Sequence, residues 1–210
     1  AGRIHARRAE DVVRARRGGE VLAVVMTLLR KPFMVETPYR PTLLFDGVDD
    51  IALIGQNKIN ALLNGASGFT FSAWIKQTAL ASQRVFTVFI NGTNIGARLT
   101  LSATGFIVFG GVSQSTDALQ GGTDTTRAIN LGELVHIAGT IDFANAVIKS
   151  YVNGVLGLNV SATFGSTTYV AGTPTANSEE AIGGARSGGV NSLFFSGTID
   201  EVQFWSTVRT

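Results

Sequence analysis

The carboxylates in the second part of the chain decide whether this sequence could carry acid–base catalysis. Cleavage of a glycosidic bond needs two carboxyl groups about 5–9.5 Å apart. On a strand, that means two acids separated by one residue, because alternate side chains share a face. After residue 50 no acids have this spacing, and the doublets Glu179–Glu180 and Asp200–Glu201 point to opposite faces. The sequence therefore predicts no catalytic pair, and a hydrolase would need acids that converge from loops.

Histidine and cysteine offer no nucleophilic site either. The chain has no cysteine, which excludes disulfides, thiolate metal sites and cysteine nucleophiles. His136 lies in the middle of an alternating stretch, and the other histidine, His5, lies near the N-terminus. No Ser/His/Asp constellation can be built from them. We expect His136 to be a packed, hydrogen-bonded residue and the protein not to be an enzyme.

Composition and periodicity predict an all-β fold. The chain has 210 residues, with 25 glycines, 4 prolines and only 15% charged residues, as in β proteins with many tight turns. From Thr42 onward apolar and polar residues alternate, as in Phe69 to Lys76. Asn91-Gly92 and Asn153-Gly154 are hairpin-turn dipeptides. We expect about a dozen short strands in two antiparallel sheets packed face to face, with no helix beyond residue 65.

Two segments bracket this alternating part. Leu44 to Asp50 opens it and Gly197 to Phe204 closes it, and both have the form of half-buried strands with a polar interruption. In the closing segment the period of two is broken, because Ile199 and Val202 are both apolar. This break predicts a β-bulge.

The N-terminal segment differs in kind. Residues 1–40 carry nine Lys/Arg and four Asp/Glu (+5), whereas residues 41–210 carry eight and eleven (−3). Ile4 to Arg17 could form a short amphipathic helix, Val21 to Leu29 a strand or a second short helix, and the following prolines indicate an extended tether. The apolar run Val21 to Leu29 is too short to span a membrane. A secretory signal is also a poor interpretation of the N-terminus. We expect residues 1–41 to be a basic arm with a tether and residues 42–210 to be the domain.

The arginines of this arm could bind an acidic partner. They could neutralise nucleic-acid phosphates or pair with an acidic protein surface. No aromatic residues interleave with them, which disfavours nucleic acid. We therefore expect residues 1–40 to bind other subunits of a large assembly that contains many copies of the protein. The arginines concerned are Arg3, Arg7, Arg8, Arg14, Arg16 and Arg17.

Four segments follow one another along the chain: Leu44 to Asp50, Phe69 to Lys76, Glu133 through Gly154, and Phe195 to Val202. In this order they resemble the laminin-G-like, concanavalin-A-like jelly-roll superfamily, over about residues 42–208. One departure is Leu134, where that family often has tryptophan. The resemblance implies a jelly-roll sandwich with an extended basic arm before it.

The resemblance also implies a cation site. Members of the superfamily often hold calcium near the paired first and last strands, and calcium takes six to eight oxygen ligands. Asp46 and Asp200 could supply carboxylates, with Asp49 or Asp50 from the adjoining turn. The alternative is that Asp46 and Asp49 cap the turn around Gly47 through side-chain to backbone hydrogen bonds.

Sugar binding needs exposed aromatic rings. Trp74 lies on the face opposite Phe69 and Phe71, so it is the candidate for glycan contact, and the alternative is that it packs. Members of the superfamily include sugar-binding modules, adhesion domains and structural parts of virus particles. From the arm and the missing catalytic acids we expect a virion decoration or tail protein, located in the virion and anchored by its arm. The alternative is a carbohydrate-binding module of a surface or secreted protein.

Overall fold

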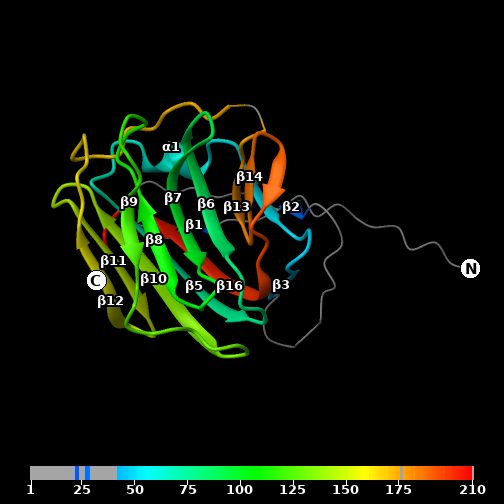
Figure 1. The fold of residues 1–210 in the computed structure, drawn as a ribbon. Coiled ribbons are helices and arrows are strands. Elements are labelled where there is room, and N and C mark those ends of the chain that lie inside the picture. The colour runs from blue at the N-terminus through cyan, green and yellow to red at the C-terminus, as the bar shows by residue number, and fades with distance from the viewer. Residues whose placement is uncertain (1–21, 24–26, 29–41, 176, 210) are drawn as a thin grey trace, which may run out of the picture.

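The fold is a sandwich of two antiparallel sheets. The computed structural model describes residues 22–23, 27–28, 42–175 and 177–209. In Figure 1, β6, β7 and β8 form the front layer, and β5, β10 and β16 form the layer behind it. The predicted all-β jelly-roll sandwich is confirmed. Among the described residues, no helix is long and apolar enough to cross a membrane.

The first sheet has seven strands and holds both bracketing segments. β16 lies between β5 on one side and, on the other, β3 and β1, which pair with successive parts of it. The strands in order are β1 (Leu22–Ala23), β16 (Ser196–Trp205), β5 (Gly68–Gln77), β10 (Leu134–Asp142), β11 (Val147–Val152) and β12 (Val155–Ser161), with β3 (Leu43–Asp46) beside β16.

The second sheet also has seven strands. They follow the order β2 (Thr27–Leu28), β4 (Ala52–Gly55), β13 (Glu180–Ile182), β6 (Gln83–Asn91), β7 (Asn94–Leu101), β8 (Ile107–Gly111) and β9 (Gln120–Thr123). A separate hairpin, β14 (Ala185–Ser187) with β15 (Val190–Ser192), and one short helix, α1 (Ile59–Leu63), complete the described elements.

Aromatic rings fill the space between the sheets. Phe71 of the first sheet and Phe86 of the second have ring centroids 4.2 Å apart. Phe204 meets Phe86 nearly at a right angle, with centroids 5.5 Å apart. All three are fully buried. Gly139 permits this packing on β10, because a Cβ there would lie 2.6 Å from the ring of Phe109. Removing one such ring costs about 3–5 kcal/mol.

The predicted turns and bulge are present. Asn153 and Gly154 join β11 to β12 with φ of 51° and 77°, as a type I′ turn requires. The pairing of β16 with β5 shifts register between Asp200 and Gln203, and Glu201 has φ of 49°. The bulge expected in Ile199 to Val202 is therefore confirmed.

Part of the segment before residue 42 pairs with the sandwich. Leu22–Ala23 lies beside β16 of the first sheet, and Thr27–Leu28 lies beside β4 of the second. The strand interpretation of Val21 to Leu29 is correct for these residues. The expected helix at Ile4 to Arg17 lies outside the described residues. The boundary placed at residue 42 stays a prediction, and the domain recruits strands from before it.

A buried carboxylate ties the helix to the second sheet. Glu180 of β13 accepts backbone hydrogen bonds from Lys58, Ile59 and Asn60 at 2.6–2.8 Å, at the start of α1. Asn60 in turn accepts a hydrogen bond from the Tyr169 hydroxyl at 2.9 Å. Burial raises the pKa of Glu180 to about 7, although the three N–H groups and Lys58 oppose the shift.

Replacing Glu180 tests this network. Glu180→Gln should destabilise the fold by about 1–3 kcal/mol, since an amide cannot accept all three N–H bonds. Because the pKa of Glu180 is raised in the folded state, folding favours the protonated carboxyl. The stability that Glu180 contributes is therefore fully present below pH 4.5 and is lost as the pH rises to about 7. The difference in unfolding free energy between wild type and Glu180→Gln should therefore shrink from pH 4.5 to 7.5 in urea titrations.

The matched control is Glu179→Gln. Glu179 lies next in sequence, but its partner is Arg186 at 3.0 Å and it is only half-buried. This variant should change stability by less than about 1 kcal/mol. A wild-type to Glu180→Gln difference that is constant across pH would contradict the raised pKa.

Candidate functional site

The strand register separates the two carboxylates that were expected to share a cation. Asp46 lies opposite Ser196 on β16, and Asp200 lies four residues further along that strand, opposite Trp74 on β5. Four residues of extended chain span about 13 Å. Asp200 accepts its hydrogen bonds from Thr42 and from the N–H of Glu201. The pairing of β16 with β3 and β5 therefore keeps Asp46 and Asp200 too far apart to bind one ion.

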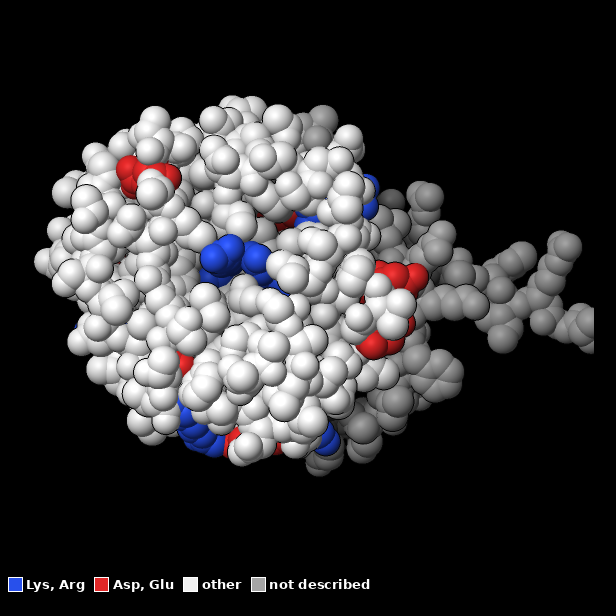
Figure 2. Space-filling view, in the orientation of Figure 1, with Lys and Arg blue, Asp and Glu red and all other residues white. Residues whose placement is uncertain are grey.

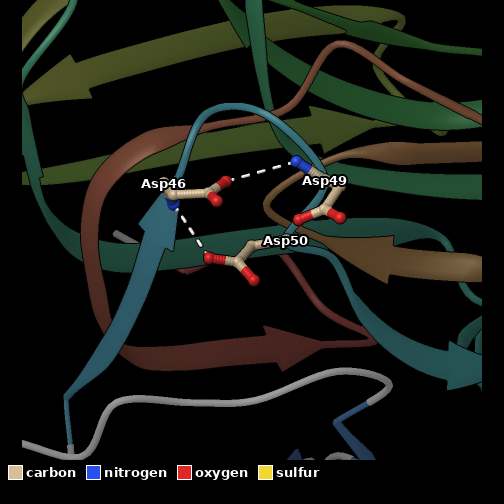
Figure 3. Close-up of side chains that lie close together, drawn as sticks. All are labelled: Asp46, Asp49 and Asp50. Carbon is tan, nitrogen blue, oxygen red and sulfur yellow. Dashed lines mark hydrogen bonds between the residues drawn. The ribbon is translucent and has the colours of Figure 1, made fainter.

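Asp46 instead gathers with the two acids of its own turn (Figure 3). Its Oδ1 accepts N–H hydrogen bonds from Val48 at 2.7 Å and Asp49 at 3.2 Å, and its own N–H donates to Asp50 at 2.9 Å. The Val48 bond lowers the pKa of Asp46, whereas partial burial and the neighbouring charges raise the pKa of Asp50. The turn-capping alternative is thus present for Asp46.

These three carboxylates also have the chemistry of a cation site. One oxygen from each lies within 4.8 Å of the others, and Asp46 and Asp49 are exposed. Asp46 and Asp50 each keep one oxygen outside the turn hydrogen bonds, and among the described residues the hydrogen bonds of this turn leave the Asp49 carboxylate unused. This set fits a calcium ion whose remaining ligands are water. Calcium binding stays a prediction, now centred on the turn.

Trp74 lies on the outer face of the first sheet. Ala73 and Ile75 on either side of it are fully buried, while Trp74 is 38% exposed. His136 is its neighbour on β10 and Asp200 its neighbour on β16. The rings of Trp74 and His136 meet edge to face, with centroids 5.3 Å apart. His136 is thus packed as expected, and burial lowers its pKa, against the charge of Glu201.

Polar and aromatic groups surround this tryptophan on the same face. One row further along the sheet, Gln203 lies opposite Ser72, and Tyr151 lies opposite Ala138, which itself faces Ser72. Gln203 and Tyr151 are half-buried. We call Trp74, His136, Tyr151, Asp200 and Gln203 the Trp74 face. It offers one exposed ring amid hydrogen-bonding groups.

Two further aromatic residues lie in packed surroundings. Tyr169 is buried in the core, and Trp205, at the far end of β16, has the guanidinium of Arg209 at 5.4 Å from its ring. The arginines expected to bind a partner, Arg3, Arg7, Arg8, Arg14, Arg16 and Arg17, lie outside the described residues.

Four further acids serve local structure. Each accepts hydrogen bonds from a nearby turn, loop or strand and is thereby fixed in place. The residues and partners are Asp117 with Ser113 and Gln114, Asp124 with Thr126 and Ser150, Glu133 with Asn130 and Arg127, and Asp142 with Asn145.

Two residues on the second sheet were missed. Arg84 and Arg98 lie on adjacent strands and face away from the core. The sequence feature that could have identified them is a single charged residue inside each of two apolar strands. The sequence does not reveal that these strands are neighbours in a register that brings both charges together.

The chain belongs to the concanavalin A-like lectin/glucanases superfamily. The family's sequence profile matches residues 48–210. This confirms the family resemblance, which rested on the four segments. No curated protein matches the chain in sequence.

Solved structures share the fold. One is the CBM40 domain of Ruminococcus gnavus IT-sialidase bound to α2,6-sialyllactose, with a TM-score of 0.62 and 16% identity, covering 81% of this chain and 93% of that one. Another is the native heptameric SAP-like pentraxin of Limulus polyphemus, with a TM-score of 0.57 and 17% identity, covering 80% and 76%. At this identity the likeness shows the fold alone.

Calcium titration tests the acidic turn. An exposed site of this kind should bind Ca²⁺ with a Kd of about 1 mM, so about 10 mM Ca²⁺ should stabilise the protein by about 1.4 kcal/mol. Asp49→Asn should abolish this response without disturbing the turn, whereas Asp200→Asn should keep it. Thermal unfolding in Ca²⁺ and in EDTA measures both, and an equal response in wild type and Asp49→Asn would exclude the turn as the site.

Proposed function

We propose that this protein is a non-catalytic carbohydrate-binding module whose sugar lies on the Trp74 face. The observation that carries the proposal is the exposed ring of Trp74 in the middle of β5, within a sheet whose other face forms the core. An exposed indole held on a rigid strand offers a flat apolar surface on which a sugar ring can stack.

The chemistry of the Trp74 face suits a sugar. A pyranose ring has one apolar face, which stacks on an indole, and hydroxyls at its edge, which need donors and acceptors. Asp200, directly opposite Trp74, offers a carboxylate. In the next row of the sheet, Gln203 offers an amide and Tyr151 a hydroxyl. The edge-to-face contact with His136 holds the indole in place, which reduces the entropy lost on binding.

The structural relatives support this proposal. The CBM40 domain of the R. gnavus sialidase is seen with sialyllactose, and this chain spans most of that domain. An extracellular or cell-surface setting is proposed with it. The proposal that the protein is not an enzyme rests on the acids, since those described above hold local backbone and side-chain groups.

The assembly interpretation remains the second proposal from the sequence. It requires residues 1–40 to bind other subunits, and no observation on the described residues favours a virion decoration or tail protein. The strand pairing at Leu22–Ala23 and Thr27–Leu28 places part of this segment against its own domain. The comparisons favour the carbohydrate-binding alternative.

The Trp74 face is tested by substitution. Trp74→Ala should weaken binding to a glycan selected on an array at least tenfold, because burial of a large aromatic contributes roughly 1.5–3 kcal/mol. Calorimetric titration measures the change. Binding that survives in Trp74→Ala would place the sugar elsewhere, and a wild-type array without any signal would overturn carbohydrate binding itself.

Trp205→Phe is the matched control. These two are the only tryptophans of the chain, and Trp205 is covered by Arg209 at the end of the same sheet. This variant should bind as the wild type does. Its fluorescence then comes from Trp74 alone, so the sugar should shift its emission directly.

Removal of residues 1–41 separates the two functional proposals. Loss of β1 and β2 should lower the thermal midpoint, because the edges of β16 and β4 lose their pairing. If the protein is a carbohydrate-binding module, glycan affinity should stay within about twofold of the full chain. Loss of a stable oligomer with unchanged glycan binding, measured by light scattering, would support an assembly role for the arm.

A further inference from the structure

Two arginines lie side by side on the outer face of the second sheet. Arg84 on β6 faces Thr100 on β7, and Thr87 on β6 faces Arg98 on β7. Their neighbours Phe86, Leu99 and Leu101 point into the core, so these four polar residues point outward. They form a compact patch, here called the arginine pair site, on strands that the core holds rigid.

Two polar groups of this patch, on Arg84 and Thr100, are buried without adequate partners. Arg84 is only 4% exposed, and its Nε has no hydrogen-bond partner. Its Nη1 reaches Thr87 Oγ1 at 3.5 Å, which is the limit of a hydrogen bond. The Oγ1 of Thr100, directly opposite, is also buried and unpartnered. Among the described residues, four buried side-chain atoms lack a hydrogen-bond partner, and two of them belong to this patch.

Within the described part of the chain, neither Arg84 nor Arg98 forms an ion pair. The ion pairs found in the described part of the chain, Arg127–Glu133 and Arg186–Glu179, use other arginines. Burial lowers the pKa of Arg84 to about 10, with a further contribution from the charge of Arg98, so Arg84 remains cationic at neutral pH. Burial also lowers the pKa of Arg98. A buried charge without a counterion is strongly unfavourable. An anion bound beside Arg84 would remove this cost.

The surroundings leave room for such an anion. Figure 2 shows Lys and Arg side chains together in a hollow over the front sheet, within a largely uncharged surface. On one side, Gly110 of β8 lies opposite Arg98 and Gly121 of β9 lies opposite Gly110, so no side chain rises there. On the other side, the backbone N–H of Arg84 donates a hydrogen bond of 2.8 Å to the carbonyl oxygen of Leu193, which fixes the chain there.

We propose that Arg84 and Arg98 form a second ligand site that binds the carboxylate of an acidic sugar. The inference rests on the proposed carbohydrate-binding function but uses the opposite sheet from the Trp74 face. Guanidinium groups bind a planar carboxylate through paired N–H donors, and Arg84 Nε and Thr100 Oγ1 are the unused groups that would meet it.

Charge and shape favour a single acidic group over a polyanion. Nucleic acid needs a row of cations along its phosphates, whereas here two guanidinium groups share one hollow. Residues 41–210 carry eight basic and eleven acidic residues, a net charge of −3, which repels an extended polyanion. One carboxylate on an otherwise neutral sugar matches this distribution.

Calorimetric titration of the full chain with glucuronate, N-acetylneuraminate and glucose tests the site. Both acids, but not glucose, should bind to the wild type. Arg84→Gln and Arg98→Gln should each weaken that binding roughly tenfold or more, since a charge-assisted bond is lost. The matched control is Lys149→Gln, which removes one charge from the other sheet and should leave binding unchanged.

Each other outcome overturns the proposal. If inorganic sulfate or acetate binds as tightly as the sugar acids, the site recognises a free anion and not a sugar. If an acidic peptide or an oligonucleotide binds there more tightly than the sugar acids, the ligand class is wrong. Failure of the acids while Trp74-dependent glycan binding persists removes this inference alone, and failure of both removes the carbohydrate function as well.

A stability measurement separates a ligand site from a structural role. In the absence of ligand, Arg84→Met should raise the thermal midpoint, because it replaces an uncompensated buried charge with an apolar chain of similar size. The same variant should lose binding of glucuronate. A lowered midpoint would mean that the guanidinium supports the fold, which would overturn the proposal.

Discussion

The contact between Phe71, Phe86 and Phe204 is the constraint on which the rest of the structure depends. It joins the two sheets through rings 4.2–5.5 Å apart. Because side chains on a strand alternate between faces, fixing Phe71 inward also fixes Trp74 outward, three residues later on β5. A slip of one residue would bury the indole and expose the phenylalanines. The hydrophobic core therefore sets the position of the outward-facing groups.

The two outer faces then differ in chemistry, and this difference suggests two kinds of ligand contact. The Trp74 face combines an exposed ring with neutral and acidic hydrogen-bonding groups. The face above β6 and β7 holds two cations and unpartnered polar atoms. Both lie on strands packed against the same core, so neither needs a mobile loop to form. Glu180 gives rigidity at one end of the sandwich, where it binds the start of α1.

Local patterns predicted most of the fold, whereas contacts across strands were harder to predict. The alternation around Phe71, the turn at Asn153-Gly154 and the bulge after Ile199 depend on neighbours in sequence, and all are present. The separation of Asp46 from Asp200 depends on the register of β3 with β16. The proximity of Arg84 to Arg98 depends on a register shift next to Val85. Such registers follow from packing of the whole sheet. Trp74 was placed correctly because alternation alone determines its face.

The most direct measurement is an amide and indole NMR spectrum recorded during titration with neutral oligosaccharides chosen from a glycan array. Carbohydrate binding at the proposed position predicts that the indole N–H of Trp74 and the amides of His136 and Gln203 shift together, with one affinity. The same titration should leave the indole of Trp205 unchanged. Shifts confined to other parts of the sandwich, or no shifts at millimolar sugar, would contradict carbohydrate binding on the Trp74 face.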